Sequence, residues 1–323
     1  MMMMDMCSDV DHNCEAKIQY PCYRQNIFLT GLTTVHKVHC RNSLIYFTSH
    51  LKLFIMNPRQ IILSCCLMAT MAFPAALRAQ TVPTVPSGPV PVWSDEFDYT
   101  GFPDSTKWGY DTGGHGWGNE EWQFYTKQRR ENIWVENGKL TIEARKENFE
   151  GRNFTSARLV SKGKGEWQYG RIEVRAKLPR GRGTWPAIWM LSANPEKWPD
   201  DGEIDIMEHV GYNQGMVHGT VHTKKFNHTI GTQVGDSISF SDLSDKFHVY
   251  SLDWNTDSIR ISVDNKTYFT FKNDGTGPDA WPFDKKMYLI LNIAVGGSWG
   301  GQKGVDDTAF PARMEIDYVR VYK

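Results

Sequence analysis

The stretch Asp201-Gly202-Glu203-Ile204-Asp205-Ile206-Met207-Glu208-His209 alternates acidic side chains with large apolar ones. This alternation predicts a half-buried β-strand, because successive side chains along a strand point to opposite faces of the sheet. Glu203 and Asp205 would then share the polar face, while Ile204 and Ile206 would face the core. The fold around this strand is therefore expected to contain a sheet with one buried face.

Glu208 has the wrong parity for that polar face, since it lies five residues after Glu203. An unpaired carboxylate buried in a protein core is costly. One extra residue at Ile206-Met207, a β-bulge, would return Glu208 to the polar face, and bulges often lie beside active sites. We therefore expect all three acids to line one face of the sheet.

Three carboxylates on one sheet face repel one another, so at least one is expected to have a raised pKa, as a general acid requires. A protonated and an ionised carboxyl on the two sides of a bond are the groups that hydrolyse glycosides. A flat strand would hold the α-carbons of Glu203 and Glu208 about 13 Å apart. The strand must therefore curve if the carboxyls are to reach the roughly 5–5.5 Å of a retaining enzyme.

Two other interpretations of this stretch remain open. It would also suit a solvated edge strand, or a calcium site, because hard cations bind clustered oxygen atoms.

Outside this stretch, the composition joins two unlike segments. The 323 residues carry a formal net charge of -1, which gives no electrostatic reason to expect nucleic acid or an anionic membrane as a partner. All six cysteines lie in the first 66 residues, whereas all twelve tryptophans lie between Trp93 and Trp299. The length allows one large domain or two small ones.

Residues 1–55 show no clean hydrophobic period, and we interpret them as an upstream extension without packed structure. Four cysteines in this extension could form disulfides or bind a metal, although their spacing matches no zinc pattern. They are Cys7, Cys14, Cys22 and Cys40.

Residues 56–79 combine a short basic segment, an apolar run and a small residue at Ala79, which predicts a signal peptide and a secreted protein. A membrane anchor is the alternative, but the run is short for a span and contains Pro74. Lipid attachment at Cys65 or Cys66 is also open, though both lie close to the basic segment. Residues 80–91 are rich in proline and predict an extended linker.

Residues 92–323 contain many short alternating segments separated by turn signals, and no sustained helical period. An Asn-Gly pair within 135–139 predicts a hairpin turn, and a second turn is expected at 264–266. Residues 287–294 are apolar on both faces, as in a central strand. This pattern predicts an all-β fold, a two-sheet β-sandwich with an outer face that curves into a groove.

Tryptophan and histidine side chains are candidates to line such a groove, because sugars stack on aromatic rings and bond through their hydroxyls. His218 and His222 share the polar face of an expected strand, but at about 13 Å apart they cannot share one zinc ion. We interpret His222 as a neighbour of the acids that holds Asp205 or a substrate hydroxyl, with an ordinary surface histidine as the alternative. Core packing is the alternative for each tryptophan. The candidates are Trp117, Trp122, Trp185, Trp189 and Trp299.

Together these residues resemble glycoside hydrolase family 16 in its laminarinase-like group. The resemblance covers 92–323 and rests on five motifs, at 116–121, 183–191, 203–208, 219–222 and 291–297. It implies a β-jelly roll with a concave substrate cleft, which hydrolyses internal bonds of a β-linked glucan or galactan with retention. One departure is Trp122, where many relatives carry a smaller aliphatic residue.

The resemblance also implies roles for individual residues. Glu203 would be the nucleophile and Glu208 the acid/base, with Asp205 between them tuning the proton. No cofactor is implied for catalysis. A structural calcium ion on the convex side would be held by Glu96, the carbonyl of Gly138 and Asp317, tying both chain ends of a cysteine-free sandwich. The implied substrate-binding residues are Asn119, Arg158, Trp185, Trp189, His222 and Trp299.

The sequence thus predicts a secreted endo-β-1,3-glucanase that acts on laminarin-like or mixed-linked β-glucan by double displacement. A galactan hydrolase of the agarase or carrageenase type is the runner-up, and transglycosylation shares the same intermediate. A non-catalytic carbohydrate-binding jelly roll is the alternative from another class, since fold alone does not give function. The expected partner is a polysaccharide, with neither nucleic acid nor an obligate protein partner.

Overall fold

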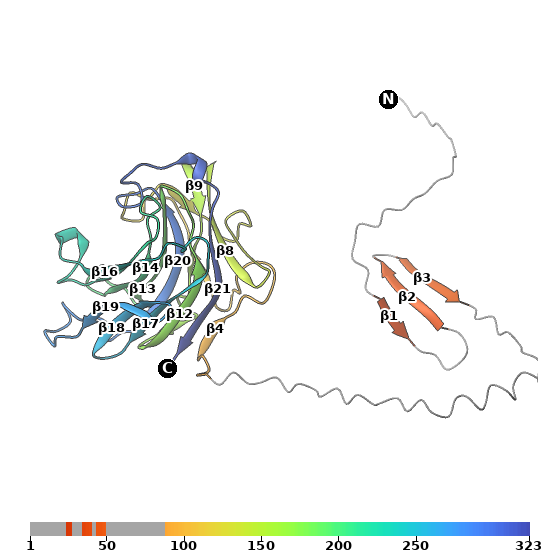
Figure 1. Cartoon of the computed structure of the whole chain (residues 1–323), viewed down its shortest axis with the longest axis horizontal. Helices are drawn as coiled ribbons and strands as arrows, with labels where there is room; N and C mark the ends of the chain where they lie inside the picture. The colour runs from red at the N-terminus through yellow and green to blue at the C-terminus, as the bar shows by residue number, and fades with distance from the viewer. Residues whose placement is uncertain (1–23, 28–33, 41–42, 50–87) are drawn as a thin grey trace, which may run out of the picture. The chain divides into compact units, whose positions relative to one another are not determined.

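The computed structural model describes residues 24–27, 34–40, 43–49 and 88–323. They fall into two units, one within Met1–Thr84 and one within Val85–Lys323, which we describe separately (Figure 1). No helix among these residues is long and apolar enough to span a membrane. The predicted signal peptide at 56–79 and most of the predicted linker lie outside the described residues.

The first unit contains a three-stranded antiparallel sheet. Its strands are β1 (Arg24–Ile27), β2 (Thr34–Cys40) and β3 (Ser43–Ser49). These strands were not foreseen from the sequence, and the interpretation of 1–55 as an extension without packed structure stays a prediction. Their β-branched and aromatic residues favour extended backbone even without strict alternation. Cys7, Cys14 and Cys22, and any disulfide or metal set with them, lie outside the described residues.

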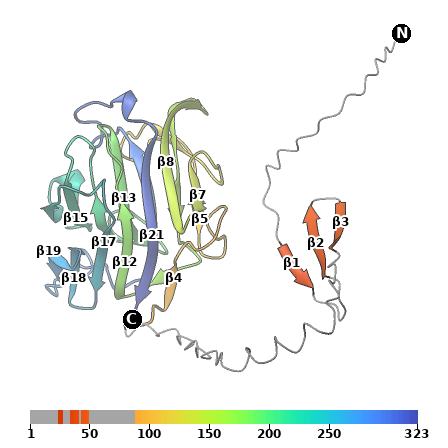
Figure 2. The ribbon, with the colours of Figure 1, turned by 45° about the vertical axis from the view of Figure 1, so that its right-hand side comes forward.

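The second unit is a sandwich of two sheets, which confirms the predicted all-β fold (Figures 1 and 2). The eight-stranded sheet has the order β16-β15-β14-β13-β20-β10-β5, with β11 also paired to β20. Its strands are β5 (Gly109–Asp111), β10 (Arg158–Val160), β11 (Glu166–Trp167), β13 (Thr184–Ser192), β14 (Glu203–Glu208), β15 (Met216–His222), β16 (Val234–Ser239) and β20 (Met287–Val295).

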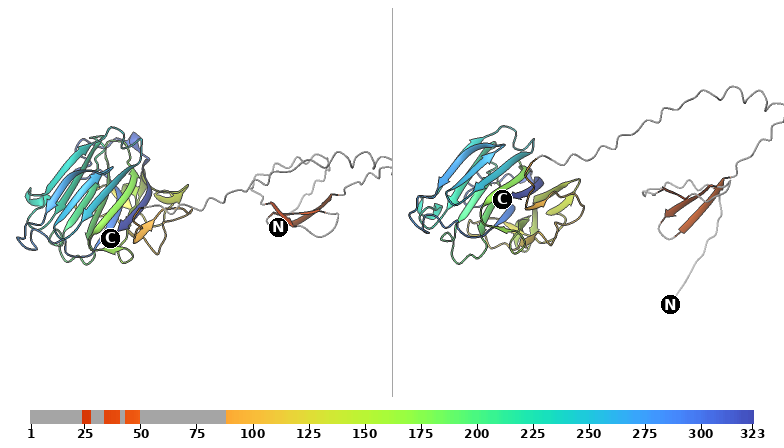
Figure 3. Two further views of the ribbon diagram at one scale, coloured as in Figure 1. Left: turned by 60° about the horizontal axis from the view of Figure 1, so that its bottom comes forward. Right: turned by 90° about the horizontal axis from the view of Figure 1, so that it is seen from below.

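The ten-stranded sheet has the order β19-β18-β17-β12-β21-β8-β9-β6, with β4 also paired to β21 and β7 to β8. Strand β4, near the start of this unit, lies beside β21, which ends at the C-terminus (Figure 3). The strands are β4 (Trp93–Asp95), β6 (Gln123–Tyr125), β7 (Ile133–Glu136), β8 (Lys139–Phe149), β9 (Arg152–Ser156), β12 (Gly170–Lys177), β17 (His248–Trp254), β18 (Ser258–Val263), β19 (Lys266–Lys272) and β21 (Ala312–Tyr322).

The core lies between the two sheets and is built by the alternation seen in the sequence. In β8, Leu140, Ile142 and Ala144 are fully buried. The central strand β20 is buried along its whole length, as its apolar character on both faces predicted. Each such aliphatic side chain contributes about 1.5–3 kcal/mol by leaving water.

The two predicted turns are also confirmed. Asn137 and Gly138 have φ angles of 55° and 70° and join β7 to β8. Two successive positive φ angles define a type I′ turn, which matches the twist of the strands that it joins and favours Asn-Gly. Asp264 and Asn265, with φ angles of 50° and 63°, make the equivalent turn between β18 and β19.

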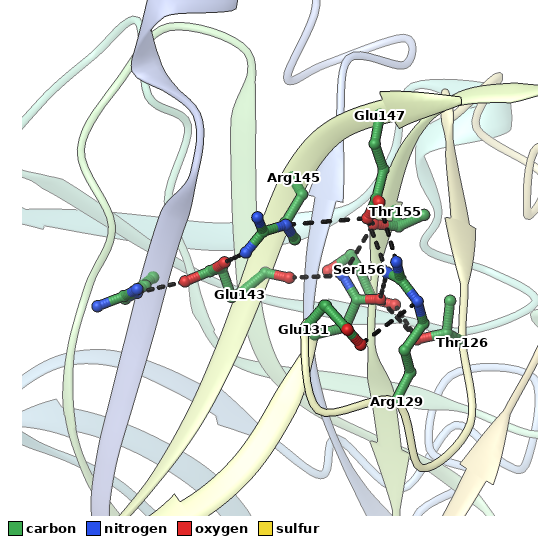
Figure 4. Close-up of polar contacts among 10 residues, drawn as sticks. Thr126, Arg129, Glu131, Glu143, Arg145, Glu147, Thr155 and Ser156 are labelled. Atoms are coloured by element: carbon green, nitrogen blue, oxygen red, sulfur yellow. Dashed lines mark hydrogen bonds and ion pairs between the residues drawn. The ribbon is translucent and has the colours of Figure 1, made fainter. Parts of the chain in front are cut away.

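A polar network supports the end of β8 and β9 (Figure 4). The side chain of Glu143 is fully buried and pairs with both Arg145 and Arg313. Arg129 donates two hydrogen bonds to the Glu147 carboxylate, at 2.7 and 2.9 Å. A buried carboxylate without its partners is strongly destabilising, so this network holds the two strands in one arrangement.

Ile142→Ala should lower the free energy of unfolding by about 2–5 kcal/mol, because it leaves a cavity between the sheets. Urea unfolding of the variant and of Thr270→Ala, an exposed control, measures this difference. Equal stability of Ile142→Ala and the wild type would contradict this placement of the core.

Candidate active site

Strand β14 carries an irregularity at the position that the sequence predicted. On the β13 side, Met207 pairs with Ile188 and Asp205 with Trp189, so Ile206 is the extra residue. On the β15 side, the register shifts between Asp205 and Glu208. This β-bulge lets Ile206 and Met207 both face the core, where they are fully buried. Glu208 is thereby returned to the face that carries Glu203, as predicted.

A cleft of about 1080 Å³ lies on the outer face of the eight-stranded sheet, and all three acids line it. All six residues predicted to bind substrate line it too. They are Asn119, Arg158, Trp185, Trp189, His222 and Trp299. The structure thus brings together the predicted set from six separate segments of the chain, while the role of each residue stays a prediction.

The acids are held by donors from neighbouring elements. Trp198 Nε1 donates to Glu203 Oε2 at 2.8 Å, and Trp185 Nε1 donates to Glu208 Oε1 at 2.9 Å. His222 Nε2 lies 3.3 Å from Asp205 Oδ2, which agrees with its interpretation as a neighbour of the acids. Each glutamate therefore accepts a hydrogen bond from an indole, whereas Asp205 has the imidazole nearby without a hydrogen bond.

Burial raises the pKa of every acid in the cluster. Desolvation, followed by the charge of Asp205, raises the pKa of Glu203 to about 8, and desolvation raises the pKa of Asp205 to about 7. The pKa of Glu208 is raised well above its usual value by burial and by the charge of Asp205. Three crowded carboxyls therefore share protons near neutral pH, as the sequence predicted.

A tryptophan N–H and the charge of His222 oppose this rise in both glutamates, Trp198 at Glu203 and Trp185 at Glu208. His222 and the Trp198 N–H lower the pKa of Glu203 against the effect of burial. Glu208 is the more suitable proton carrier, because its pKa is raised well above the usual value. A nucleophile must be ionised, so the full rise for Glu203 conflicts with that role, whereas its two nitrogen neighbours favour it.

The cluster also includes the one group of described residues whose ligand atoms could meet at a metal ion. Oxygen or nitrogen atoms of Glu203, Asp205 and His222 lie within 4.8 Å of one another. Metal ligands must be deprotonated, so an ion here would compete with the protons that burial favours on Glu203 and Asp205. The Trp198 N–H also uses an oxygen of Glu203. The group therefore fits an acid–base site better than a metal site.

The residues predicted to bind calcium meet near one point of β21. Glu96 follows β4, which pairs with β21 at Val319, and Gly138 precedes β8, which pairs with β21 at Ile316. However, the Glu96 carboxylate accepts two hydrogen bonds from Arg320, at 2.9 and 2.7 Å. Asp317 accepts one from Arg175 at 2.6 Å.

Guanidinium groups thus bond to both oxygens of Glu96 and to one oxygen of Asp317, and the calcium ion stays a prediction. The pairing of Glu96 with Arg320 joins the two ends of the domain, and such exposed pairs contribute about 0–1 kcal/mol.

Two residues that the sequence interpretation did not single out belong to the site. Trp198 binds Glu203 and packs beside His222 and His228, with ring centroids 6.0 and 5.1 Å away. The sequence feature that could have identified Trp198 is its position five residues before Glu203. Glu121 is a fourth buried carboxyl in the cleft, and it accepts a hydrogen bond of 2.6 Å from Gln123. Glu121 lies inside the motif at 116–121, but no alternation of polar and apolar residues around it marks it as a cleft residue.

Arg158 links the cleft to its aromatic wall. Its guanidinium lies 4.7 Å from the ring centre of Trp117 and 4.6 Å from that of Trp189, and Nε donates to Asp111 at 3.0 Å. Trp299 packs against Trp185 with ring centroids 5.5 Å apart. Four of the five candidate tryptophans thus form cleft walls rather than core.

Trp122 is the exception, and its place corrects the expectation that it lines the groove. Glu121 lines the cleft and the side chain of Gln123 is fully buried, whereas the indole of Trp122 is 43% exposed and does not line the cleft. Successive side chains of extended backbone point to opposite sides, which explains the difference.

An acid cluster in a long cleft walled by aromatic side chains, on the face of a β-sandwich, is typical of glycoside hydrolases. The family model of glycosyl hydrolases family 16 matches residues 120–320, and the chain belongs to this family. The resemblance inferred from the motifs is thereby confirmed.

Several known proteins are similar to the chain. A β-glucanase of Rhodothermus marinus is 59% identical over 241 residues, which cover 72% of this chain and 84% of the relative. The solved laminarinase from Rhodothermus marinus is 56% identical, with a TM-score of 0.72 over 73% of this chain and 98% of that one. A variant of SCLam, a non-specific endo-β-1,3(4)-glucanase co-crystallised with 1,3-β-D-cellotriosyl-glucose, is 50% identical, with a TM-score of 0.71 over 74% and 96%.

Glu203→Gln should make the fold more stable at pH 7.5 than the wild type, by on the order of 1–3 kcal/mol, and no different at pH 4.5. The folded state prefers protonated Glu203, so the wild type loses stability as the pH rises from the usual pKa of 4.5 towards about 8. Urea unfolding at both pH values tests this. Glu136→Gln, at an exposed glutamate, is the control, and a gain independent of pH would contradict the expectation.

Proposed function

We propose that the protein is a secreted, retaining endo-β-1,3-glucanase that acts on laminarin-like or mixed-linked β-glucan. The observation that carries the proposal is the β-bulge at Ile206, which turns Glu203 and Glu208 to the same side of β14 within one cleft. The names of the similar proteins support β-glucan as the substrate. Secretion rests on the predicted signal peptide at 56–79.

The mechanism follows from the environment of each acid. Glu203 attacks the anomeric carbon while Glu208 protonates the leaving oxygen, which gives a covalent glycosyl-enzyme. Glu208 then removes a proton from water, and that water releases the sugar with retained configuration. The Trp198 N–H stabilises Glu203 as a carboxylate, and buried Glu208 retains its proton until the leaving group needs it.

Asp205 has a different role, because it is nearly fully buried between the other two acids and faces His222. Its charge raises the pKa of both glutamates. The charge of Glu203 also raises the pKa of Glu208, and this repulsion is lost when Glu203 forms its bond to the sugar, so the pKa of Glu208 falls. Glu208 is then prepared to act as a base in the second step.

The acid cluster also decides against the alternative from another class. Binding a sugar requires hydrogen bonds and stacking, which the tryptophans and polar side chains of the cleft supply. Three crowded carboxyls whose pKa values are raised by desolvation, and in the two glutamates also by the charge of Asp205, would only cost stability in a binding module. Catalysis gives a reason for that cost.

Glu203→Gln should reduce hydrolysis to background while the variant still binds glucan, because the nucleophile is lost and the cleft is unchanged. Release of reducing ends from laminarin, lichenan and agar measures both activity and substrate. We expect the wild type to cleave the two glucans and not agar. Glu120→Gln, at an exposed glutamate, is the control. Hydrolysis by Glu203→Gln would contradict the role of Glu203, and release from agar alone would favour a galactanase.

Trp198→Phe should move the acidic limb of the kcat/KM profile to higher pH. Without the indole N–H, the carboxylate form of Glu203 loses a hydrogen bond worth about 1.5–3 kcal/mol, so its pKa rises and the ionised fraction falls at a given pH. Rates of the wild type and the variant between pH 4 and 9 measure the shift. Trp185→Phe is the matched control, because it removes the donor to Glu208 and should move the alkaline limb upward instead. An acidic limb that stays in place in Trp198→Phe would contradict the prediction.

A further inference from the structure

A second hollow of about 650 Å³ lies outside the cleft and shares no lining residue with it. It is formed by Trp122, by the facing ends of β8 and β9, and by Asp307 at the start of a short 3-10 helix, η2 (Asp307–Ala309). Its volume falls within the range of small-molecule sites. Nothing in the catalytic proposal uses it.

Trp122 forms a fixed aromatic platform in this hollow. Its backbone N–H donates to the carbonyl of Val295 at 2.9 Å. A Cβ atom on Gly296 would lie 2.6–2.8 Å from three atoms of the indole, so only glycine lets the backbone cover that face of the ring. Because Gly296 covers one face, the exposed 43% of Trp122 lies on the other side, towards the hollow.

Polar side chains surround this platform. Lys146 and Asp307 form an ion pair at the rim, and the exposed amides of Asn148 and Asn153 lie on the tip of the β8–β9 hairpin. Sugars are recognised by this combination of an aromatic face with amide and charged groups that bond to hydroxyls.

The hollow is also rigid, as a binding site requires. The neighbouring Glu147 is fixed by two hydrogen bonds from Arg129 in the network of Figure 4. Arg152 donates to the carbonyls of Gly114 and Glu121, which hold the segment that carries Trp122. The segments that carry the lining residues are therefore held by hydrogen bonds on both sides of the hollow.

The charges of the lining balance, which indicates a neutral occupant. The two cations, Lys146 and Arg152, are matched by the two anions, Glu147 and Asp307. A sulfated or otherwise anionic polymer would need an excess of positive charge. An apolar peptide would have to remove these ion pairs from water without adding a hydrogen bond to any of them.

We propose that this hollow is a second carbohydrate site, which binds a segment of neutral β-1,3-glucan through stacking on Trp122. This inference rests on the proposed function. A polymer held there stays attached to the enzyme while another segment occupies the cleft, which raises the effective concentration of substrate. The site should therefore matter for long or insoluble glucan and not for an oligosaccharide that fills the cleft alone.

The test compares binding and catalysis in the full chain. In a Glu203→Gln background, Trp122→Ala should weaken binding to insoluble linear β-1,3-glucan particles by roughly tenfold, the loss expected for one stacking contact. With Glu203 intact, Trp122→Ala should slow hydrolysis of the particles but leave kcat/KM for a β-1,3-linked glucose tetrasaccharide unchanged. Trp122→Tyr should restore much of the binding. Phe102→Ala, at an aromatic residue that is 40% exposed and lines neither hollow, is the matched control.

Equal particle binding by Trp122→Ala and its parent would overturn the second site. An equal loss of activity on the tetrasaccharide would also overturn it, because Trp122 would then act through the cleft. If Trp122→Ala does not fold, Asn153→Ala with Asp307→Asn provides the same comparison from exposed positions. If the wild type does not cleave the tetrasaccharide, the proposed glucanase is refuted. The comparison of particle binding between Trp122→Ala and its parent then still tests the second site.

Discussion

One extra residue in β14 is the constraint on which the active site depends. A strand without irregularity would bury Glu208 between the sheets, where an unpaired carboxylate costs several kcal/mol. The bulge at Ile206 lets two successive apolar side chains face the core and returns the third acid to the cleft. The core thus keeps its apolar lining, and the cleft gains the second glutamate that glycoside hydrolysis requires.

The acids are costly even in the cleft, and the surrounding residues reduce that cost. Burial alone would leave all three protonated, which suits a general acid but not a nucleophile. The indole N–H groups of Trp198 and Trp185 and the imidazole of His222 each lie beside one carboxyl. Residues that form the walls of the cleft therefore also adjust the protonation of its acids. The aromatic walls and the acid–base chemistry are parts of one arrangement.

Tryptophan rings beside polar and charged side chains occur in two places on this domain. In the cleft, Trp299 packs against Trp185 and Arg158 lies over Trp117 and Trp189. In the second hollow, Trp122 lies flat on Gly296 among amides and balanced charges. Only the cleft contains a cluster of buried acids. The catalytic acids therefore lie in one place, whereas sugar is bound in two.

The sequence by itself determined the class of fold and the bulge, because strand periodicity and the cost of burying charge are local properties, and its motifs, through the family that they resemble, pointed to six of the residues that line the cleft. Alternation placed Leu140, Ile142 and Ala144 in the core, and broken parity at Glu208 located the irregularity. Tertiary structure decided the partners, which depend on segments that meet only after folding. It directed Trp198 at Glu203, paired Glu96 and Asp317 with arginines, and turned Trp122 away from the cleft. No spacing along the chain encodes these contacts, because each joins side chains whose positions are set by the packing of different elements.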